Sequence, residues 1–213
     1  MKILLIGNGG REHTLLSLIK NSPCVKKIYS ISANGGMSPY VHNIDIPIHD
    51  VKKIAEFALS EKIDLTVVGH EIPLVAGISD EFKIRNLQIF GPNKRAAQLE
   101  GSKIFTKEFL KRYNIPSASF EIFNNSKSAK EFIHNEYKNK RVVIKADGLA
   151  QGKGVKVCEN KTEACEFISL LMDDKIFGKA GDNIIIEECL SGFELSCMVL
   201  TDGKNVLPLA TAR

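Results

Sequence analysis

Features that define several other classes of protein are missing from this sequence. No apolar run approaches the roughly 18 residues that a membrane-spanning helix requires, and the apolar stretch at the start is too short for a signal peptide. The net charge is +4, but the basic residues are spread along the chain and form no block of the kind that binds nucleic acid. We therefore expect a cytoplasmic protein that binds neither membranes nor nucleic acid.

The cysteine pattern excludes two further classes. The chain has five cysteines, an odd number, and no CxxC pair. A disulfide framework and a structural zinc site are therefore not expected. Several of these cysteines lie in apolar runs, so we expect buried free thiols in a reducing compartment. They are Cys24, Cys158, Cys165, Cys189 and Cys197.

The first hundred residues alternate between short apolar runs and stretches with helical periodicity. The chain of 213 residues is 44% hydrophobic and 25% charged, which suits one large or two small globular domains. Alternating strands and helices predict βαβ units and a Rossmann-like, doubly wound parallel sheet. The expected strands are 2–6, 28–31, 64–69 and 87–92, and the expected helices are 11–20 and one beginning at Val51.

The pattern changes near residue 92. Residues 94–112 read as helical with a break at Gly101-Ser102, where we place the boundary between domains 1–102 and 103–213. The second half predicts an α+β fold with mostly antiparallel pairing. Its strands are expected at 119–123, 141–145, 154–158, 183–189 and 194–200, and its helices at 126–138 and 162–172. The chain ends at Arg213 directly after an apolar run, and we expect a truncated chain.

The motif GNGGREH, residues 7–13, follows the first strand and opens a helix. Its glycines allow close backbone approach, and the helix N-terminus and Arg11 suit an anion. The alternative without a ligand is an ordinary strand–helix turn with a solvated arginine. A nicotinamide dinucleotide fingerprint is not matched, because Glu12 occupies the position of the third glycine.

Further along, VVGHEIPLVAGISD (67–80) follows another strand, at the edge where open α/β sheets bind ligands. Its Glu71 suits an amine or a ribose hydroxyl, and the alternative is a surface carboxylate.

Glycine and lysine alternate in VVIKADGLAQGKGVKV (142–157), between two expected strands. The connection exceeds a tight hairpin, and it predicts a flap over a polyphosphate. The P-loop pattern is absent, and the alternative is a mobile surface hairpin.

Two weaker motifs complete the set. In IIIEECLSGFELS (184–196), the linker suits an adenine and Glu194, on a second strand, suits the ribose hydroxyls. In QLEGSKIFTKEFL (98–110), Lys103 begins a helix and suits a nucleotide phosphate. Exposed glutamates and a solvated lysine are the respective alternatives.

In their order and spacing, these five motifs resemble the glycinamide ribonucleotide synthetase (phosphoribosylamine–glycine ligase) family over almost the whole chain. The resemblance implies a Rossmann-like N-terminal domain followed by an incomplete ATP-grasp domain, with 124–190 as a lid subdomain and 191–213 starting a central one. It implies that ATP phosphorylates glycine and that 5-phosphoribosylamine attacks the acyl phosphate, a step of purine biosynthesis.

The resemblance also assigns residues. For ATP it implies Lys103, Lys145, Gly148, Gly152, Lys153, Gly154, Glu187, Glu188, Leu190 and Glu194. For phosphoribosylamine we add Glu71 to Gly9, Gly10 and Arg11. Mg²⁺ or Mn²⁺ is the expected metal. Its ligands are expected beyond residue 213, so no metal ligand is assigned, no catalytic residue is assigned, and the chain alone is expected to be an inactive part of a monomeric enzyme.

One segment and two positions depart from the family pattern. SANGGMSPY (32–40) matches the family's PGNxGT loop only loosely. His70 stands where the family commonly has proline, and Phe193 where it often has a second glutamate.

Three alternatives stay open from the sequence. One is another ATP-grasp ligase or carboxylase of the purine pathway, and another is a non-catalytic nucleotide-binding module. The last is a nicotinamide-dependent oxidoreductase, which Glu12 disfavours.

Overall fold

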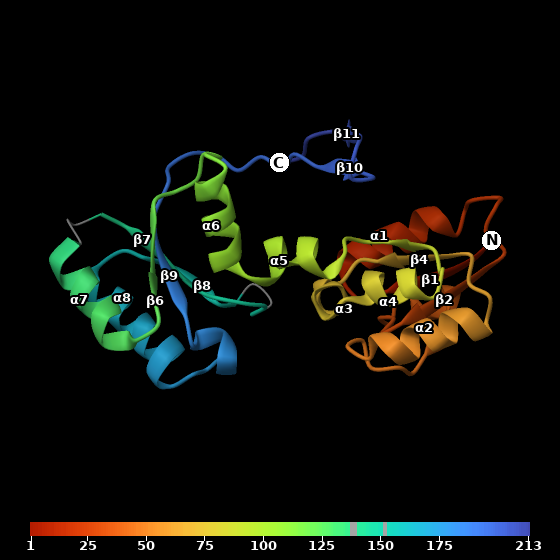
Figure 1. Ribbon diagram of the computed structural model, residues 1–213, viewed down its shortest axis with the longest axis horizontal. Coiled ribbons are helices and arrows are strands. Elements are labelled where there is room, and N and C mark those ends of the chain that lie inside the picture. Colours follow the sequence, from red (N-terminus) through yellow and green to blue (C-terminus); the bar gives the residue numbers. More distant parts are fainter. Residues whose placement is uncertain (137–139, 151–152) are drawn as a thin grey trace.

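The computed structural model describes residues 1–136, 140–150 and 153–213. Figure 1 shows two bodies joined by a helical segment, with a two-stranded hairpin reaching over the gap between them. No helix in the described ranges is both long and apolar enough to span a membrane.

The first body contains a five-stranded sheet in which every neighbouring pair is parallel. The strand order β3-β2-β1-β4-β5 reverses direction after β1, as in doubly wound folds. This confirms the Rossmann-like layer predicted from the alternating pattern, although β3 was not expected. The strands are β1 Lys2–Ile6, β2 Lys27–Ile31, β3 His42–Ile44, β4 Leu65–Val68 and β5 Ile89–Phe90.

Helices cover both faces of this sheet, and the alternation of side chains along β1 shows why. Leu4 and Ile6 pack on one face against buried residues such as Ile54 and Phe82, whereas Ile3 and Leu5 pack on the other against a cluster that includes Leu16. A strand buried on both faces reads as a continuous apolar run, which is what KILLI is. The helices of this body are α1 Gly10–Ile19, α2 Val51–Ser60, α3 Glu71–Ala76 and α4 Ile78–Ile84.

The segment that follows β4 folds as two short helices, which were not expected from its motif at the ligand-binding edge of the sheet. His70 is the N-cap of α3, and its Nδ1 accepts a hydrogen bond from the Ile72 backbone N–H at 3.2 Å. Gly77 separates α3 from α4 with φ +96°, a left-handed conformation that favours glycine. The departure from proline at position 70 therefore supplies a helix cap.

The first body leads into α5 Lys94–Gly101 and the second begins with α6 Lys103–Arg112, with the break at Ser102 that the sequence predicted. Ser102 caps α6 by accepting a hydrogen bond from the Phe105 N–H at 3.0 Å. Its hydroxyl also donates to Asp147, at 3.0 Å from Oδ1. The start of α6 is thus fastened to the loop that follows β7.

The second body contains a four-stranded antiparallel sheet in the order β6-β9-β7-β8. This confirms the predicted antiparallel α+β character. Its strands are β6 Phe120–Phe123, β7 Val142–Ala146, β8 Val155–Cys158 and β9 Ile184–Glu188. Its helical elements are α7 Ser126–Glu136, α8 Lys161–Ile168, a π-helical turn Ser169–Asp173 and a 3₁₀ turn Gly178–Gly181.

The two faces of this sheet differ in character. Ile144, Ile184 and Ile186 point to one face, where they form the core with α7, α8 and the π-helical turn. Lys145 and Glu187 alternate with them and therefore point to the opposite face, toward α6. The polar face is consequently available for a site.

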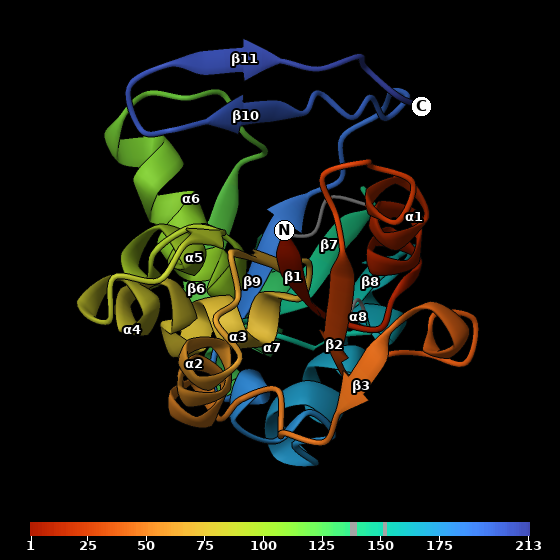
Figure 2. The same ribbon diagram turned by 90° about the vertical axis from the view of Figure 1, so that its right-hand side faces the viewer.

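The strand predicted at 194–200 is wrong over most of its length, since only Val199 and Leu200 of that range lie in a strand. The structure forms β10 Val199–Thr201, paired with β11 Val206–Pro208, and Glu194 precedes the hairpin outside any strand. Only an isolated bridge between Ser196 and Ala212 extends the pairing. Every residue from 190 to 213 is exposed, so burial does not fix this segment as a longer strand. Figure 2 shows the hairpin standing above the rest of the molecule.

The cysteines are all free, but the expectation that they are buried is wrong for most of them. Only Cys158 is buried, whereas Cys165 and Cys189 are partly exposed. Cys24 lies in an exposed turn, and Cys197 belongs to the exposed C-terminal segment. An apolar sequence neighbourhood indicates burial only where another layer covers the strand.

Candidate active site

One cavity brings together predicted residues from both bodies. Its volume is about 560 Å³. The first body contributes Arg11 and Glu71, and the second contributes Lys103, Lys145 and Glu187. The complete lining in the described ranges is Arg11, Glu71, Leu99, Glu100, Lys103, Thr106, Lys107, Lys145, Gly148, Leu149, Ala150, Gly154, Val155 and Glu187.

The cavity is rich in ammonium groups that sit beside carboxylates. Lys103 Nζ donates to the Gly148 carbonyl oxygen at 2.9 Å. Burial lowers the pKa of Lys103 from its ordinary value, and the nearby Lys145 charge acts in the same direction, against the charge of Asp147. Lys145 Nζ and Lys107 Nζ both lie 3.0 Å from Glu187 Oε2. Such a cluster suits a polyanion, since phosphate oxygens can replace the carboxylate oxygen as acceptors.

Glu187 is the most buried charged group of the site, with 5% of its side chain exposed. Its Oε2 holds two lysines, while its Oε1 is buried and has no hydrogen-bond partner in the described part of the chain. A buried polar atom left without a partner is costly. Oε1 is therefore a ready acceptor for a donor group that enters from the cavity.

A neighbouring cavity of about 300 Å³ lies on the side of the first body. Arg11, Glu71 and Glu100 line both cavities, and Gly69 lines the smaller one. A ligand bound at the carboxyl edge of the parallel sheet would therefore adjoin the lysine cluster.

The GNGGREH loop is organised by Glu12, which the sequence analysis noted only as a missing glycine. Glu12 is 3% exposed, and its Oε2 accepts a hydrogen bond from the Gly9 N–H at 2.6 Å. A Cβ on Gly69 would lie 2.1 Å from Glu12 Oε1, and one on Gly7 would lie 2.7 Å from its Cγ. The carboxylate thus fills the space between the loops that follow β1 and β4.

The segment SANGGMSPY (32–40) also reaches this loop. Asn34 Nδ2 donates to the Asn8 carbonyl oxygen at 2.8 Å. Asn34 Oδ1 accepts from the N–H groups of Gly36 and Met37, at 3.0 and 3.1 Å. Asn34 therefore ties the loop after β2 to the loop after β1, a role for which the sequence carried no signal.

Several of the residues assigned by resemblance lie outside the cavity. Lys153, Leu190 and Glu194 are exposed and are not among its lining residues. Gly9 and Gly10 are exposed at the start of α1 beside Arg11. Gly152 is outside the described residues. Lys107 was not predicted as a site residue from the sequence, although it lies one turn after Lys103 on the same helix.

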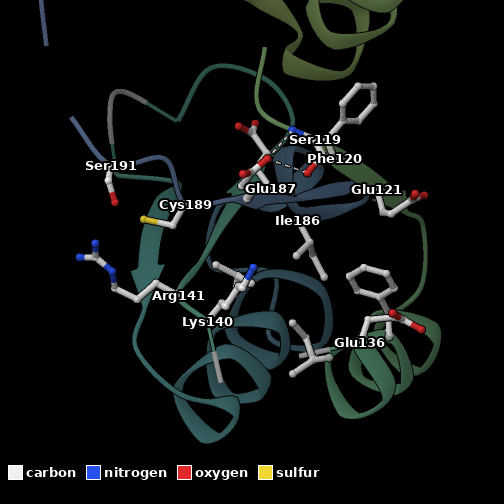
Figure 3. A pocket seen from close by; sticks show the side chains of 14 residues that line it. Ser119, Phe120, Glu121, Glu136, Lys140, Arg141, Ile186, Glu187, Cys189 and Ser191 are labelled. Carbon is white, nitrogen blue, oxygen red and sulfur yellow. Dashed lines mark hydrogen bonds between the residues drawn. The ribbon is translucent and has the colours of Figure 1, made fainter. Parts of the chain in front are cut away.

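A larger cavity, about 800 Å³, lies at the end of β9 and mainly on the helix side of the sheet. Figure 3 shows Ile186 pointing into it, with Arg141 and Lys140 on one side and Glu121 and Glu136 on the other. Glu188 lines this cavity, and its Oε2 accepts from the Ser119 hydroxyl at 2.9 Å. Those hydrogen bonds from Ser119 lower the pKa of Glu188. Glu187 lines both this cavity and the cavity of about 560 Å³ that contains the lysines. We take the cavity of about 560 Å³ as the candidate site, because the lysine cluster lines it and does not line the cavity of about 800 Å³.

Comparison with solved structures defines the class first. The biotin carboxylase domain of Hydrogenobacter thermophilus 2-oxoglutarate carboxylase, in complex with MgADP, matches with a TM-score of 0.73 at 17% identity, over 98% of this chain and 49% of that one. An identity this low concerns the fold alone. The phosphoribosylamine–glycine ligase of Thermotoga maritima matches with a TM-score of 0.78 at 30% identity, over 100% of this chain and 50% of that one. The second body is of the ATP-grasp class, as the match of residues 101–213 to the model of an ATP-grasp domain shows.

Sequence comparison then gives the family. The model of the phosphoribosylglycinamide synthetase N domain matches residues 1–100, and that of the ATP-grasp (A) domain matches residues 101–213. The chain belongs to the phosphoribosylglycinamide synthetase family. The phosphoribosylamine–glycine ligase of Caldanaerobacter subterraneus subsp. tengcongensis is 45% identical over 212 residues, which are 100% of this chain and 50% of the relative. The chain spans about half the length of the curated relatives it matches. Membership implies the use of ATP and a divalent metal.

Proposed function

We propose that this chain forms the nucleotide and phosphoribosylamine sites of a phosphoribosylamine–glycine ligase. In that reaction ATP phosphorylates the carboxylate of glycine, and the amine of 5-phosphoribosylamine displaces phosphate from the acyl phosphate. The products are glycinamide ribonucleotide, ADP and phosphate. The observation that carries the proposal is the single cavity to which Arg11 and Glu71 come from one body and Lys103 and Lys145 from the other.

The chain's residues contribute positioning and charge to this chemistry. Lys103 and Lys145 hold the phosphates, and Gly148, Leu149, Ala150 and Gly154 line the same cavity beside them. Phosphoryl transfer needs little covalent catalysis from a protein, so two ammonium groups beside the nucleotide supply a substantial part of the positioning and charge stabilisation that the reaction requires. In the same proposal Glu187, Glu188 and Leu190 border the adenine, and Glu194 binds the ribose.

The substrate side is assigned to the loop after β1. Gly9 and Gly10 are exposed at the start of α1, where the helix dipole favours an anion, although the Gly9 N–H itself donates to Glu12 Oε2. Arg11 supplies a cation for the phosphate of phosphoribosylamine, and Glu71 accepts from its amine or hydroxyl groups.

The proposed cofactors are ATP and Mg²⁺ or Mn²⁺. The lysine cluster and the unpaired Glu187 Oε1 fit a nucleotide. The residues described here do not fit a metal ion by themselves, since no three His, Cys, Asp or Glu side chains in those ranges converge on one point. No step is therefore assigned to a metal held by these residues.

The proposal divides the chain after Ser102 into domains 1–102 and 103–213, with 124–190 as the lid subdomain and 191–213 as the start of a central subdomain. The helix break at Ser102 and the separate sheets on its two sides support this division.

The test is glycine-dependent ADP release by the protein at its full natural length, in the presence of phosphoribosylamine. Formate and bicarbonate replace glycine in control reactions, and ADP release with one of them but not with glycine would redirect the proposal to another ligase or a carboxylase. Lys145→Ala should weaken ATP binding about 10- to 150-fold, because it removes a charge-assisted contact. Lys156→Ala is the matched control, since Lys156 belongs to the neighbouring strand and lies outside the cavity lining. Equal ATP affinity of the two variants would remove Lys145 from the nucleotide site.

A further inference from the structure

Lys107 is a buried lysine in the candidate site whose ammonium group lies against three protein oxygens. Its side chain is 10% exposed. Its Nζ lies 3.0 Å from Glu187 Oε2, 2.7 Å from Ser117 Oγ and 3.2 Å from the Ala118 carbonyl oxygen. Two of the three ammonium protons are donated to Ser117 Oγ and to the Ala118 carbonyl oxygen, and the ammonium group forms an ion pair with Glu187. Lys107 is therefore fixed in place rather than available to a nucleotide.

Lys145 is held differently. It bonds to the same Glu187 Oε2 at 3.0 Å, and both lysines line the cavity, but 27% of the Lys145 side chain is exposed against 10% of that of Lys107. One carboxylate oxygen thus has two lysine partners, one enclosed and one accessible. A ligand with phosphate oxygens can draw the accessible lysine away without disturbing the enclosed one.

We propose that Lys107 is a positioning residue, the permanent counter-ion of Glu187 that lets Lys145 exchange this carboxylate for a nucleotide phosphate. The inference rests on the proposed function, because it requires a nucleotide in this cavity. A buried carboxylate without a cation is strongly unfavourable. With Lys107 in place, Glu187 stays compensated when Lys145 leaves. Without Lys107, Glu187 retains Lys145 and competes with the phosphate.

This arrangement predicts an unusual dependence of nucleotide affinity on a residue that does not touch the nucleotide. Lys107→Met should weaken ATP binding at least about tenfold. The same substitution in the Glu187→Gln background should change affinity less than about threefold, because no buried charge then competes for Lys145. A purely structural role of Lys107 predicts the same loss in both backgrounds.

The experiment measures ATP dissociation constants by titration calorimetry for four forms of the full-length protein: the natural protein, Lys107→Met, Glu187→Gln and the double variant. Comparing the two backgrounds removes any direct effect of Glu187 on the adenine. Lys107→Arg is the conservative variant, and it should bind ATP within about threefold of the natural protein, because it keeps the charge. Thermal unfolding of each form identifies variants that are folded at the assay temperature.

The outcomes separate the two proposals. If the natural protein binds no ATP, the proposed function fails and this inference fails with it. If the natural protein binds ATP but Lys107→Met binds equally well, or loses the same factor in both backgrounds, the role of Lys107 is overturned and the proposed function stands. If Lys107→Met does not fold, Lys107→Arg decides, and a large loss of affinity in a folded Lys107→Arg protein overturns the counter-ion role.

Discussion

Replacing Gly69 with alanine tests whether Glu12 holds the loops after β1 and β4 together. The new Cβ would lie 2.1 Å from Glu12 Oε1 and 2.6 Å from its Cγ, so the whole side chain must move. Because Glu12 is only 3% exposed, that movement breaks its hydrogen bond to the Gly9 N–H.

The size of the effect follows from two costs. A hydrogen bond to a charged group contributes about 1.5–3 kcal/mol, and overpacking costs about 1–3 kcal/mol. Both arise from one displacement and overlap, so we expect the free energy of unfolding to fall by about 2–4 kcal/mol.

Urea unfolding followed by circular dichroism measures this change. Gly35→Ala is the matched control, since a Cβ there meets nothing within 4 Å, and it should change stability by less than about 0.5 kcal/mol. In the Glu12→Ala background, Gly69→Ala should lose most of its effect, because the clashing atoms are gone. Equal stability of Gly69→Ala and Gly35→Ala would refute the reasoning.

Three further outcomes are expected. Burial lowers the pKa of Lys103, and phosphate binds its ammonium form, so ATP affinity should fall as pH rises through that lowered pKa. Lys103→Arg should abolish this fall, and an identical pH profile of ATP affinity in the variant and the natural protein would contradict the prediction. Cys158 should react with iodoacetamide far more slowly than exposed Cys197, because burial raises the pKa of the Cys158 thiol to about 11. Mass spectrometry measures the labelling rate of each cysteine, and equal rates at Cys158 and Cys197 would contradict the prediction. Ser102→Ala should lower the free energy of unfolding by about 1 kcal/mol through loss of the α6 cap, and a chemical denaturation curve that coincides with that of the natural protein would disprove the cap.

Local patterning predicted most of the regular elements. The run KILLI became a strand buried on both faces, and the helix beginning at Val51 was found where its periodicity placed it. These predictions are confirmed because burial of a strand or of one helix face requires apolar residues at a regular spacing, which is visible in the sequence. The prediction failed at 194–200, where the structure supplies no burying layer, and at α3 and α4, whose short lengths carry too few repeats.

The candidate site was predictable only in part. Lys103 and Lys145 were chosen from their motifs and do lie in one cavity. Lys107 and Asn34 were not found, because their roles depend on partners far along the chain, Glu187 and Asn8 respectively. Lys153 belongs to the same motif as Lys145, and Glu194 to the motif that contains Glu187, yet Lys153 and Glu194 lie outside the cavity lining.

The sequence by itself determined the two kinds of sheet, the break at Ser102 and the family, since these depend on local periodicity and on motifs of fixed order. Only the tertiary structure decided which charged groups share a site. Lys107, Lys145 and Glu187 are brought together by strand pairing between β7 and β9 and by the packing of α6 against that sheet. Such contacts depend on the distance between side chains in space, which spacing along the chain does not specify.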